Sequence, residues 1–264
     1  MNYHLSNITR IIDRETPGPQ LESDSQCLQE RHRERELMIA LEGNVDFTLG
    51  GKVFRALPGT VFFIDSWVPH KQNYMPDDAN CTHYWLHLHD RRLFGRTLHL
   101  NEKGMHSYNE ITEFTSELTP LVRQRWQLLE RNGISPDAKK ALQLSILNMI
   151  FDDLELQPHL TGIAMGQAVD LVEMARRFIL MNHGRIVPRG ELKNICGCTE
   201  HHLMRIFKQQ TGQTIGEYTN NVRRDFVASA MAKGLSQKEI ASQLGFSSAS
   251  AFWLWRNRIN NHKR

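Results

Sequence analysis

The spacing of apolar residues changes partway along this 264-residue chain, and that change restricts the folds open to it. In the first third, Val45, Phe47 and Leu49 alternate with polar residues, and Gly50-Gly51 follows as a hairpin signal. Several short apolar runs with similar turn signals lie on either side. Short strands with regular turns predict a β-barrel or a β-sandwich.

After about residue 107, apolar residues fall at steps of three and four, which predicts amphipathic helices over 110–131 and 137–156. The segment 157–166 contains one proline and two glycines and is the best candidate for a linker. We therefore expect a two-domain α+β protein. Residues 1–160 form a β-barrel with flanking helices, and residues 161–264 form an all-α domain.

Charge changes at the same place as the predicted linker. Residues 163–264 hold 15 Lys and Arg against 7 Asp and Glu, a net charge of +8, whereas residues 1–162 carry −5. This asymmetry predicts that only the C-terminal part meets a polyanion such as DNA. Four scattered cysteines, no long apolar run and no signal-peptide pattern predict a cytoplasmic protein that does not associate with a membrane.

The basic part contains two helix-turn-helix patterns. A short helix over 190–196 stops at a glycine, and Thr199 then caps a helix that ends at Gly212. The second pattern has a capping box at 236–239, a turn at Gly245 and a cap at Ser248. A helix over 215–233, roughly 28 Å long, separates them. Successive major grooves on one DNA face lie about 34 Å apart, so two adjacent grooves are within reach.

The residues His202-Leu203-Met204-Arg205-Ile206-Phe207-Lys208, followed by Thr211-Gly212, resemble the first signature of the arabinose-regulator (AraC/XylS) family. Residues 240–247 are similar to the second, and the resemblance covers about 95 residues. It implies base contacts by His201, Met204, Arg205, Ser250 and Trp253. Phosphate contacts are expected from Lys208, Arg223, Arg224, Lys238, Arg256 and Arg258.

The second helix-turn-helix departs from the family pattern. When Ser248 is aligned with Thr199, Leu254 stands at the position of Arg205, and Arg256 stands at that of Phe207. Trp255, one position before the equivalent of Phe207, is then the expected core residue. We expect this unit to contact mainly backbone phosphates, so that Arg205→Ala changes operator preference and Arg256→Ala weakens binding evenly. Cys196 and Cys198 flank the first turn glycine. The sequence allows either of two roles for them: packing in the core, or metal binding and redox chemistry.

The N-terminal part resembles the cupin effector domains of the same family. The resemblance rests on Pro58-Gly59 through His70, and on Glu36 separated from Gly43 by six intervening residues. A small barrel of this kind encloses one small ligand. In the strand around residues 83–89, the odd-numbered residues share one face. The candidate ligand-binding residues are His32, Glu36, His70, His83, Trp85 and His87.

The resemblance implies a transcription regulator, activator or repressor, that binds double-stranded DNA and responds to a small molecule such as a carbohydrate. We expect a homodimer without a cofactor, and its two amphipathic helices either form the dimer surface or pack on their own barrel. One alternative is a metal-dependent cupin enzyme using Glu30, His32, Glu36 and His70. A second alternative is a regulator that binds no small ligand and responds to a protein partner.

Overall fold

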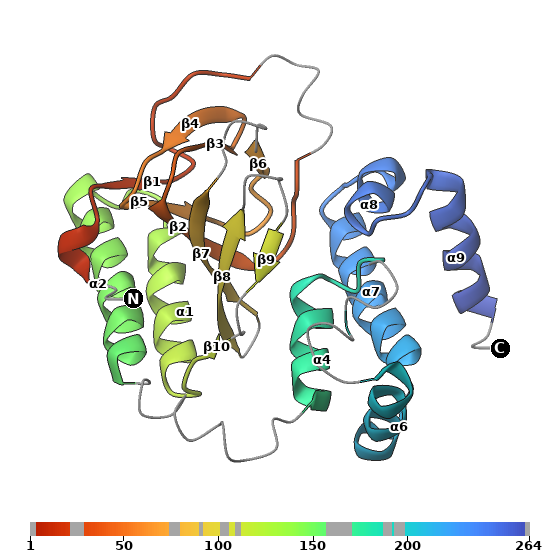
Figure 1. Ribbon diagram of the computed structural model, residues 1–264. Helices are drawn as coiled ribbons and strands as arrows, with labels where there is room; N and C mark the ends of the chain where they lie inside the picture. The colour runs from red at the N-terminus through yellow and green to blue at the C-terminus, as the bar shows by residue number, and fades with distance from the viewer. Residues whose placement is uncertain are drawn as a thin grey trace. The chain divides into compact units, whose positions relative to one another are not determined.

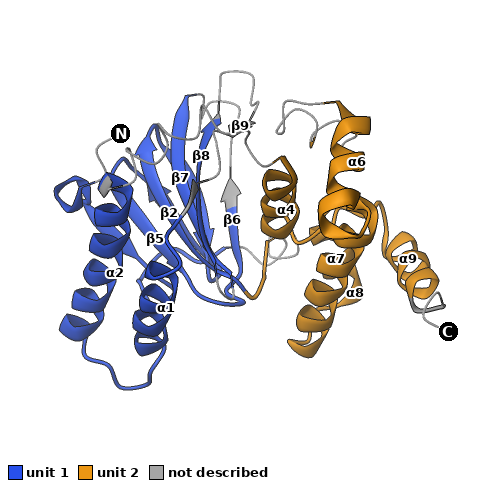
Figure 2. Ribbon diagram, turned by 90° about the horizontal axis from the view of Figure 1, so that it is seen from below, with its two compact units in different colours: residues 1–21, 34–168 blue, residues 22–33, 169–264 orange. Residues whose placement is uncertain are grey.

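The computed structural model divides the chain into two compact parts (Figure 2). The β-rich part comprises residues 1–21 and 34–168, and the helical part comprises residues 22–33 and 169–264. The structure describes residues 4–21, 29–73, 80–89, 92–100, 106–108, 112–156, 171–186, 192 and 199–261. Each part has buried apolar clusters of its own.

Two sheets form the β-rich part (Figure 1). The larger sheet has the strand order β1-β5-β2-β7-β8-β10 with β9 beside β8, and the smaller has the order β4-β3-β6. The elements are η1 (Leu5–Asn7), β1 (Arg10–Ile12), β2 (Arg35–Glu42), β3 (Val45–Leu49), β4 (Lys52–Ala56), β5 (Thr60–Ile64), β6 (His70–Asn73), β7 (Cys81–Leu88), β8 (Leu93–Leu100), β9 (His106–Tyr108) and β10 (Thr112–Glu113). All neighbours pair antiparallel except β1 and β5.

The strands expected between residues 30 and 90 are confirmed, and so is the hairpin at Gly50-Gly51. Both glycines have positive φ, 59° and 79°, and Leu49 pairs with Lys52 across the turn. Positive φ at both central positions is what a tight two-residue hairpin requires. The expected β-rich domain is present, but within the described ranges its two sheets are not joined into a closed barrel.

Alternation along β7 separates two hydrophobic cores. Tyr84, Leu86 and Leu88 belong to a cluster that includes buried residues of two helices, whereas Trp85 belongs to the cluster between the sheets. The inner cluster also contains Met38 from β2 and side chains from β3, β4 and β5. The period of two read from the sequence therefore sorts the side chains of β7 by environment.

The two helices α1 (Leu118–Leu129) and α2 (Pro136–Leu156) lie side by side against the larger sheet (Figures 1 and 2). Packing on their own sheet, one of the two expectations for these helices, is therefore observed. The first helix begins later than the predicted residue 110, because Thr112 and Glu113 pair with β8. The helix predicted from periodicity therefore included residues of a strand, because that strand is defined only by its pairing with a distant segment.

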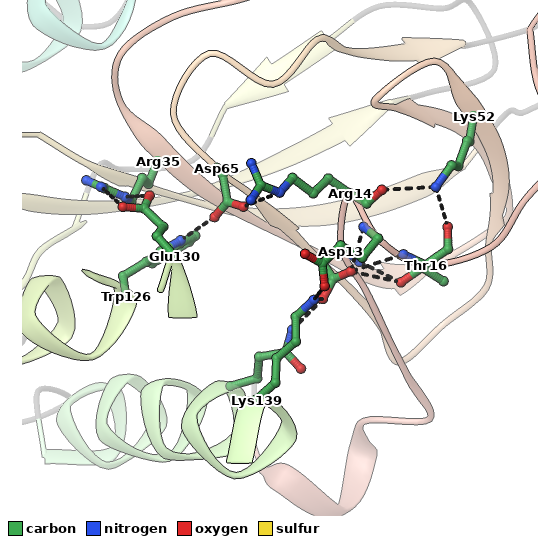
Figure 3. A network of polar contacts seen from close by, with 11 residues as sticks. Asp13, Arg14, Thr16, Arg35, Lys52, Asp65, Trp126, Glu130 and Lys139 are labelled. Carbon is green, nitrogen blue, oxygen red and sulfur yellow. Dashed lines mark hydrogen bonds and ion pairs between the residues drawn. The ribbon is translucent and has the colours of Figure 1, made fainter. Parts of the chain in front are cut away.

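Polar contacts attach these helices to the sheet (Figure 3). Trp126 Nε1 donates to Asp65 Oδ1 at 2.7 Å, and Glu130 accepts two hydrogen bonds from Arg35, at 2.7 and 2.8 Å. Lys139 of α2 pairs with Asp13 at 2.7 Å. A two-point Arg–carboxylate contact fixes orientation as well as distance. Helix α1 is thereby fixed to the sheet whose opposite face carries the candidate ligand site.

The described helices of the second part are α4 (Leu171–Met181), α6 (Glu200–Thr211), α7 (Ile215–Ala232), α8 (Gln237–Gln243) and α9 (Ala249–Asn261). Apart from Leu192, the predicted helix over 190–196 lies outside the described residues, as do Cys196, Cys198 and the predicted linker over 157–166. The long helix expected over 215–233 is α7, which has Lys233 as its C-cap. Among the helices described, none is long and apolar enough to cross a membrane.

Candidate nucleic-acid interface and ligand site

Helix α6 is terminated at both ends by the residues that the sequence indicated. Thr199 Oγ1 accepts a hydrogen bond from the backbone N–H of His202 at 3.3 Å, which caps the first turn. At the other end Gly212 adopts the left-handed conformation with φ 74°, and its N–H bonds to the carbonyl of Lys208. Helix α6 is therefore sharply bounded at both ends.

The inner face of α6 is apolar and buried. Leu203 is 2% exposed and Phe207 is 0% exposed, and both pack with residues of α4. The Phe207 ring meets Tyr218 of α7 at 5.6 Å, and the Arg176 guanidinium lies 5.6 Å from the centroid of the same tyrosine ring. This packing fixes the rotation of α6 about its axis.

The outer face of α6 carries the predicted DNA-contacting residues. His201, Met204, Arg205 and Lys208 are all exposed, and Met204 retains 48% of its accessible surface. Their spacing of three and four residues places them on one side of the helix. Arg205, the residue most critical to the prediction, therefore lies on the surface and not in the core.

A second helix pair, α8 and α9, follows α7. The predicted capping box is present: Ser236 Oγ accepts from Glu239 N, and the Glu239 carboxylate accepts from Ser236 N at 2.8 Å. Gly245 makes the turn with φ 72°, where an added Cβ would approach the carbonyl oxygen of Ile186 to 2.9 Å. Ser248 Oγ then accepts from Ala251 N at 3.1 Å and caps α9. The helix-turn-helix expected here is confirmed in its local structure.

The outer face of α9 presents Ser250, Trp253, Leu254 and Arg258, all exposed. Trp253 is 51% exposed and Leu254 is 58% exposed. Ser250 and Trp253, the residues expected to contact bases in the second unit, therefore lie on the surface. The inner face is held by Phe252, which is 0% exposed.

Trp255, the residue expected to pack inward one position before the equivalent of Phe207, is half-buried. Its ring packs on Phe246 at 5.5 Å and on Phe252 at 5.9 Å, and its Nε1 donates to Asn220 Oδ1 at 3.0 Å. The Arg223 guanidinium lies 5.2 Å from the ring centroid of Trp255 and 5.3 Å from that of Phe246. Helix α9 is thus attached to α7 through an aromatic cluster.

Arg223 requires a correction. It was predicted to contact phosphate, but it is 7% exposed, and its Nε and Nη2 donate to the carbonyl oxygen of Gly184 at 2.8 and 2.5 Å. Burial lowers the pKa of its guanidinium to about 10, which leaves it charged at neutral pH. A side chain used in this way within the protein cannot reach a phosphate.

The other five cations predicted to contact phosphate differ in exposure. Lys208, Lys238 and Arg258 are exposed, whereas Arg224 and Arg256 are half-buried. Arg224 donates to Asn221 Oδ1 one turn earlier on α7. The exposed cations are therefore the better placed to meet a polyanion.

In the β-rich part, Glu36, His70 and His87 lie close together between the sheets. Glu36 and His87 are register partners on β2 and β7, and Glu36 Oε1 accepts from His87 Nδ1 at 2.5 Å. Glu36 Oε2 lies 3.3 Å from His70 Nε2. His70 Nδ1 lies 3.0 Å from the carbonyl oxygen of Val68, which can only accept, so Nδ1 carries a proton. All three side chains are buried.

A row of rings continues from this polar group. Trp85 stacks on His87 at 6.2 Å and meets Phe47 at 6.1 Å, and Phe47 lies 6.5 Å from His70. The buried indole N–H of Trp85 has no acceptor among the described residues, an arrangement that costs free energy unless a partner supplies one. Phe47 was not selected from the sequence, although its alternation with Val45 and Leu49 placed it on this face.

His83, the remaining β7 candidate, is 1% exposed, and burial lowers its pKa to about 4. It is therefore neutral at physiological pH. His32 is grouped with the helical part, and its ring lies 4.9 Å from that of His183. Of the four residues proposed for a metal-dependent enzyme, only Glu36 and His70 lie in the β-rich part.

Comparison with known proteins assigns a family to each part. Residues 23–146 match the family described as an AraC-like ligand binding domain, and residues 192–255 match a helix-turn-helix domain. The uncharacterized HTH-type transcriptional regulator YbfI of Bacillus subtilis (strain 168) is 26% identical over 146 residues, which is 54% of this chain. The match spans about half of that relative's length, 48%.

Among solved structures, an apo point variant of ToxT from Vibrio cholerae strain SCE256 aligns over 85% of this chain and 84% of its own. The TM-score is 0.27 and the sequence identity is 12%, so the resemblance between the whole chains is remote. The two family matches, which together include both candidate sites, are the stronger finding.

Proposed function

Because one part of the chain matches an AraC-like ligand binding domain and the other a helix-turn-helix domain, we propose that it binds double-stranded DNA and controls transcription in response to a small molecule. One observation carries the proposal: α6 is capped, packed on its inner face and exposed along its predicted DNA-reading face, with Arg205 at the surface. It lies in the basic part of the chain. This activity would take place in the cytoplasm, on the chromosome.

In this proposal Arg205 supplies sequence choice and nearby cations supply affinity. A guanidinium can donate two hydrogen bonds to the O6 and N7 acceptors of guanine, which discriminates by about 1–3 kcal/mol. Lys208, Lys238 and Arg258 would pair with phosphates, which position the protein without reading sequence. Half-buried Arg224 and Arg256 would have a smaller part in this contact.

The effector would bind beside Glu36 in the β-rich part. Its carboxylate can accept hydrogen bonds from hydroxyl groups, and the Trp85 ring offers both a stacking face and a buried N–H donor. Such a mixture of aromatic and polar groups suits a polar, hydroxyl-bearing metabolite such as a sugar. The effector site would also be lined by His70, His83 and His87, whose ring nitrogens can donate or accept hydrogen bonds.

We propose that the effector acts by shifting a conformational equilibrium. It would alter how the β-rich part docks on the helical part, or how two copies pair as a homodimer. Either change alters the fraction of protein able to hold two operator half-sites. The outer surfaces of α1 and α2, whose inner faces pack on their own sheet, are the proposed contact between copies.

The test of DNA reading is a binding-site selection with the full chain, repeated with Arg205→Ala. We expect wild-type protein to enrich one sequence, and the variant to lose guanine preference at one position while retaining weaker binding. The control is Arg131→Ala, which removes the same charge from an exposed residue of the other part. Enrichment of the same sequence by wild type and Arg205→Ala would refute the role of Arg205.

The test of effector binding is a calorimetric titration of the purified full chain with a panel of sugars and related polyols. We expect one to bind, to change operator affinity, and to lose affinity about tenfold or more in Glu36→Gln, which removes the charge and keeps the shape. Exposed Glu117→Gln is the matched control. A bound sugar that is indifferent to Glu36→Gln would disprove the site.

A further inference from the structure

The caps of α6 and α9 define how the two helices correspond. Thr199 accepts from the N–H three residues later, and Ser248 does the same. Counting from these caps, Leu203 and Phe252 occupy the same position and are 2% and 0% exposed. The correspondence that sequence alignment supplied is therefore confirmed by hydrogen bonding and burial together.

At the two reading positions the chemistry differs. Met204 corresponds to Trp253, and these are 48% and 51% exposed. Arg205 corresponds to Leu254, which at 58% is the most exposed of the large apolar side chains described. The second reading helix therefore presents two adjacent apolar groups where the first presents a thioether and a guanidinium.

This apolar face lies on a surface suited to a polyanion. Arg258, one turn beyond Leu254, is exposed on the same helix, and Lys238 is exposed on α8. Ser250 lies one turn before it, with a hydroxyl that can serve either as donor or as acceptor. An exposed cation one turn from an apolar pair is consistent with a phosphate contact at the margin and base edges beside it.

We infer that α9 reads A·T base pairs through the C5 methyl group of thymine, with Trp253 and Leu254 as the contacting side chains. This rests on the proposed DNA binding. In the major groove each base pair displays a distinct pattern of groups, and thymine alone contributes a methyl. Leu254 has no hydrogen-bonding group, so an apolar contact is the one means by which it can select a base.

The experiment replaces thymine by deoxyuridine, which deletes the methyl and leaves base pairing intact. The full chain is bound to its selected duplex, with each thymine of the α9 half-site replaced in turn. We expect an affinity loss of about fourfold for each methyl contacted, the effect of burying one such group. Leu254→Ala and Trp253→Ala should bind more weakly and lose this sensitivity at their own position.

The control is Leu121→Ala, an exposed apolar residue of α1, which should respond to deoxyuridine like wild type. Wild-type binding that ignores every substitution would overturn the inference while leaving Arg205-dependent selection, and so the proposed function, intact. A chain that enriches no duplex would overturn both. If Leu254→Ala changed the sedimentation of the protein but not its thymine preference, the face would be a protein contact, which also overturns the inference.

Discussion

The two reading helices α6 and α9 share a framework and differ in the surface they present. Each has a hydroxyl cap and a fully buried phenylalanine, Phe207 or Phe252, on its inner side. Outward, one carries Arg205 and the other Leu254. Caps and core residues therefore fix the position of each helix, and its outer residues are free to differ in the chemistry they present.

The first prediction tests the shared framework and has the largest expected effect. Phe207→Ala and Phe252→Ala each leave a cavity in a fully buried site, so each should destabilise its helix pair by about 3–5 kcal/mol. Hydrogen exchange across residues 199–261 measures the loss locally. Leu254→Ala, which removes an exposed group, should change stability by less than about 0.5 kcal/mol. A tolerated Phe252→Ala would mean that α9 is not packed as α6 is.

The second prediction separates the ways in which the two helices are held. Arg223→Met removes two charge-assisted hydrogen bonds to Gly184 and the contacts with Phe246 and Trp255, a loss of about 2–4 kcal/mol. The rate of hydrogen exchange should rise more in α9 than in α6. The control Arg176→Met, at a half-exposed cation over Tyr218, should cost under about 1 kcal/mol. Equal loss of protection in both helices would contradict a separate attachment of α9.

The third prediction exchanges the outward chemistry. Leu254→Arg gives α9 the guanidinium that α6 has, on a position already exposed, so the fold should be retained. In a binding-site selection the α9 half-site should move from thymine toward guanine, with a discrimination of about 1–3 kcal/mol. Trp253→Arg is a useful companion, because it places the same group one residue away. An unchanged half-site in both variants would show that α9 does not read bases.

Local sequence signals predicted the parts of the molecule that local hydrogen bonds build. The hairpin at Gly50-Gly51, the cap at Thr199 and the capping box at Ser236 each depend on residues within a few positions of one another. The capping box of Thr214 and Glu217 has the same form and was missed, although its spacing was visible in the sequence.

Contacts between distant segments were not predictable in the same way. Arg223 precedes Phe226, Val227 and Ala230 at the spacing of one helix face, but its hydrogen bonds depend on Gly184, 39 residues away. The late start of α1 depends on the pairing of Thr112 with Gly95. In the ligand site, alternation gave the correct face of β7, but the contact of His87 with Glu36 required the register between β2 and β7.

The last prediction, with the smallest effect, concerns the stability of the helices in acid. It separates α7 and α8, the supporting helices, from the reading helices α6 and α9. Hydrogen bonds from the backbone N–H and hydroxyl of Ser236 lower the pKa of Glu239 from its usual 4.5, and those of Thr214 act likewise on Glu217. A carboxyl group with a lowered pKa stabilises the folded state above pH 4.5, and that stabilisation is lost as the pH falls through the folded pKa.

The starts of α7 and α8 should therefore loosen in acid, while α6 and α9, which have hydroxyl caps and no carboxylate partner, should not respond through this route. For Glu239 the effect is under about 1 kcal/mol, because the group is solvent-accessible and its interactions are screened. Amide exchange between about pH 6 and about pH 3 measures it, and Glu239→Gln should remove the dependence at α8. If wild type and Glu239→Gln lost protection in parallel, the acid response would arise elsewhere and the contrast between supporting and reading helices would fail.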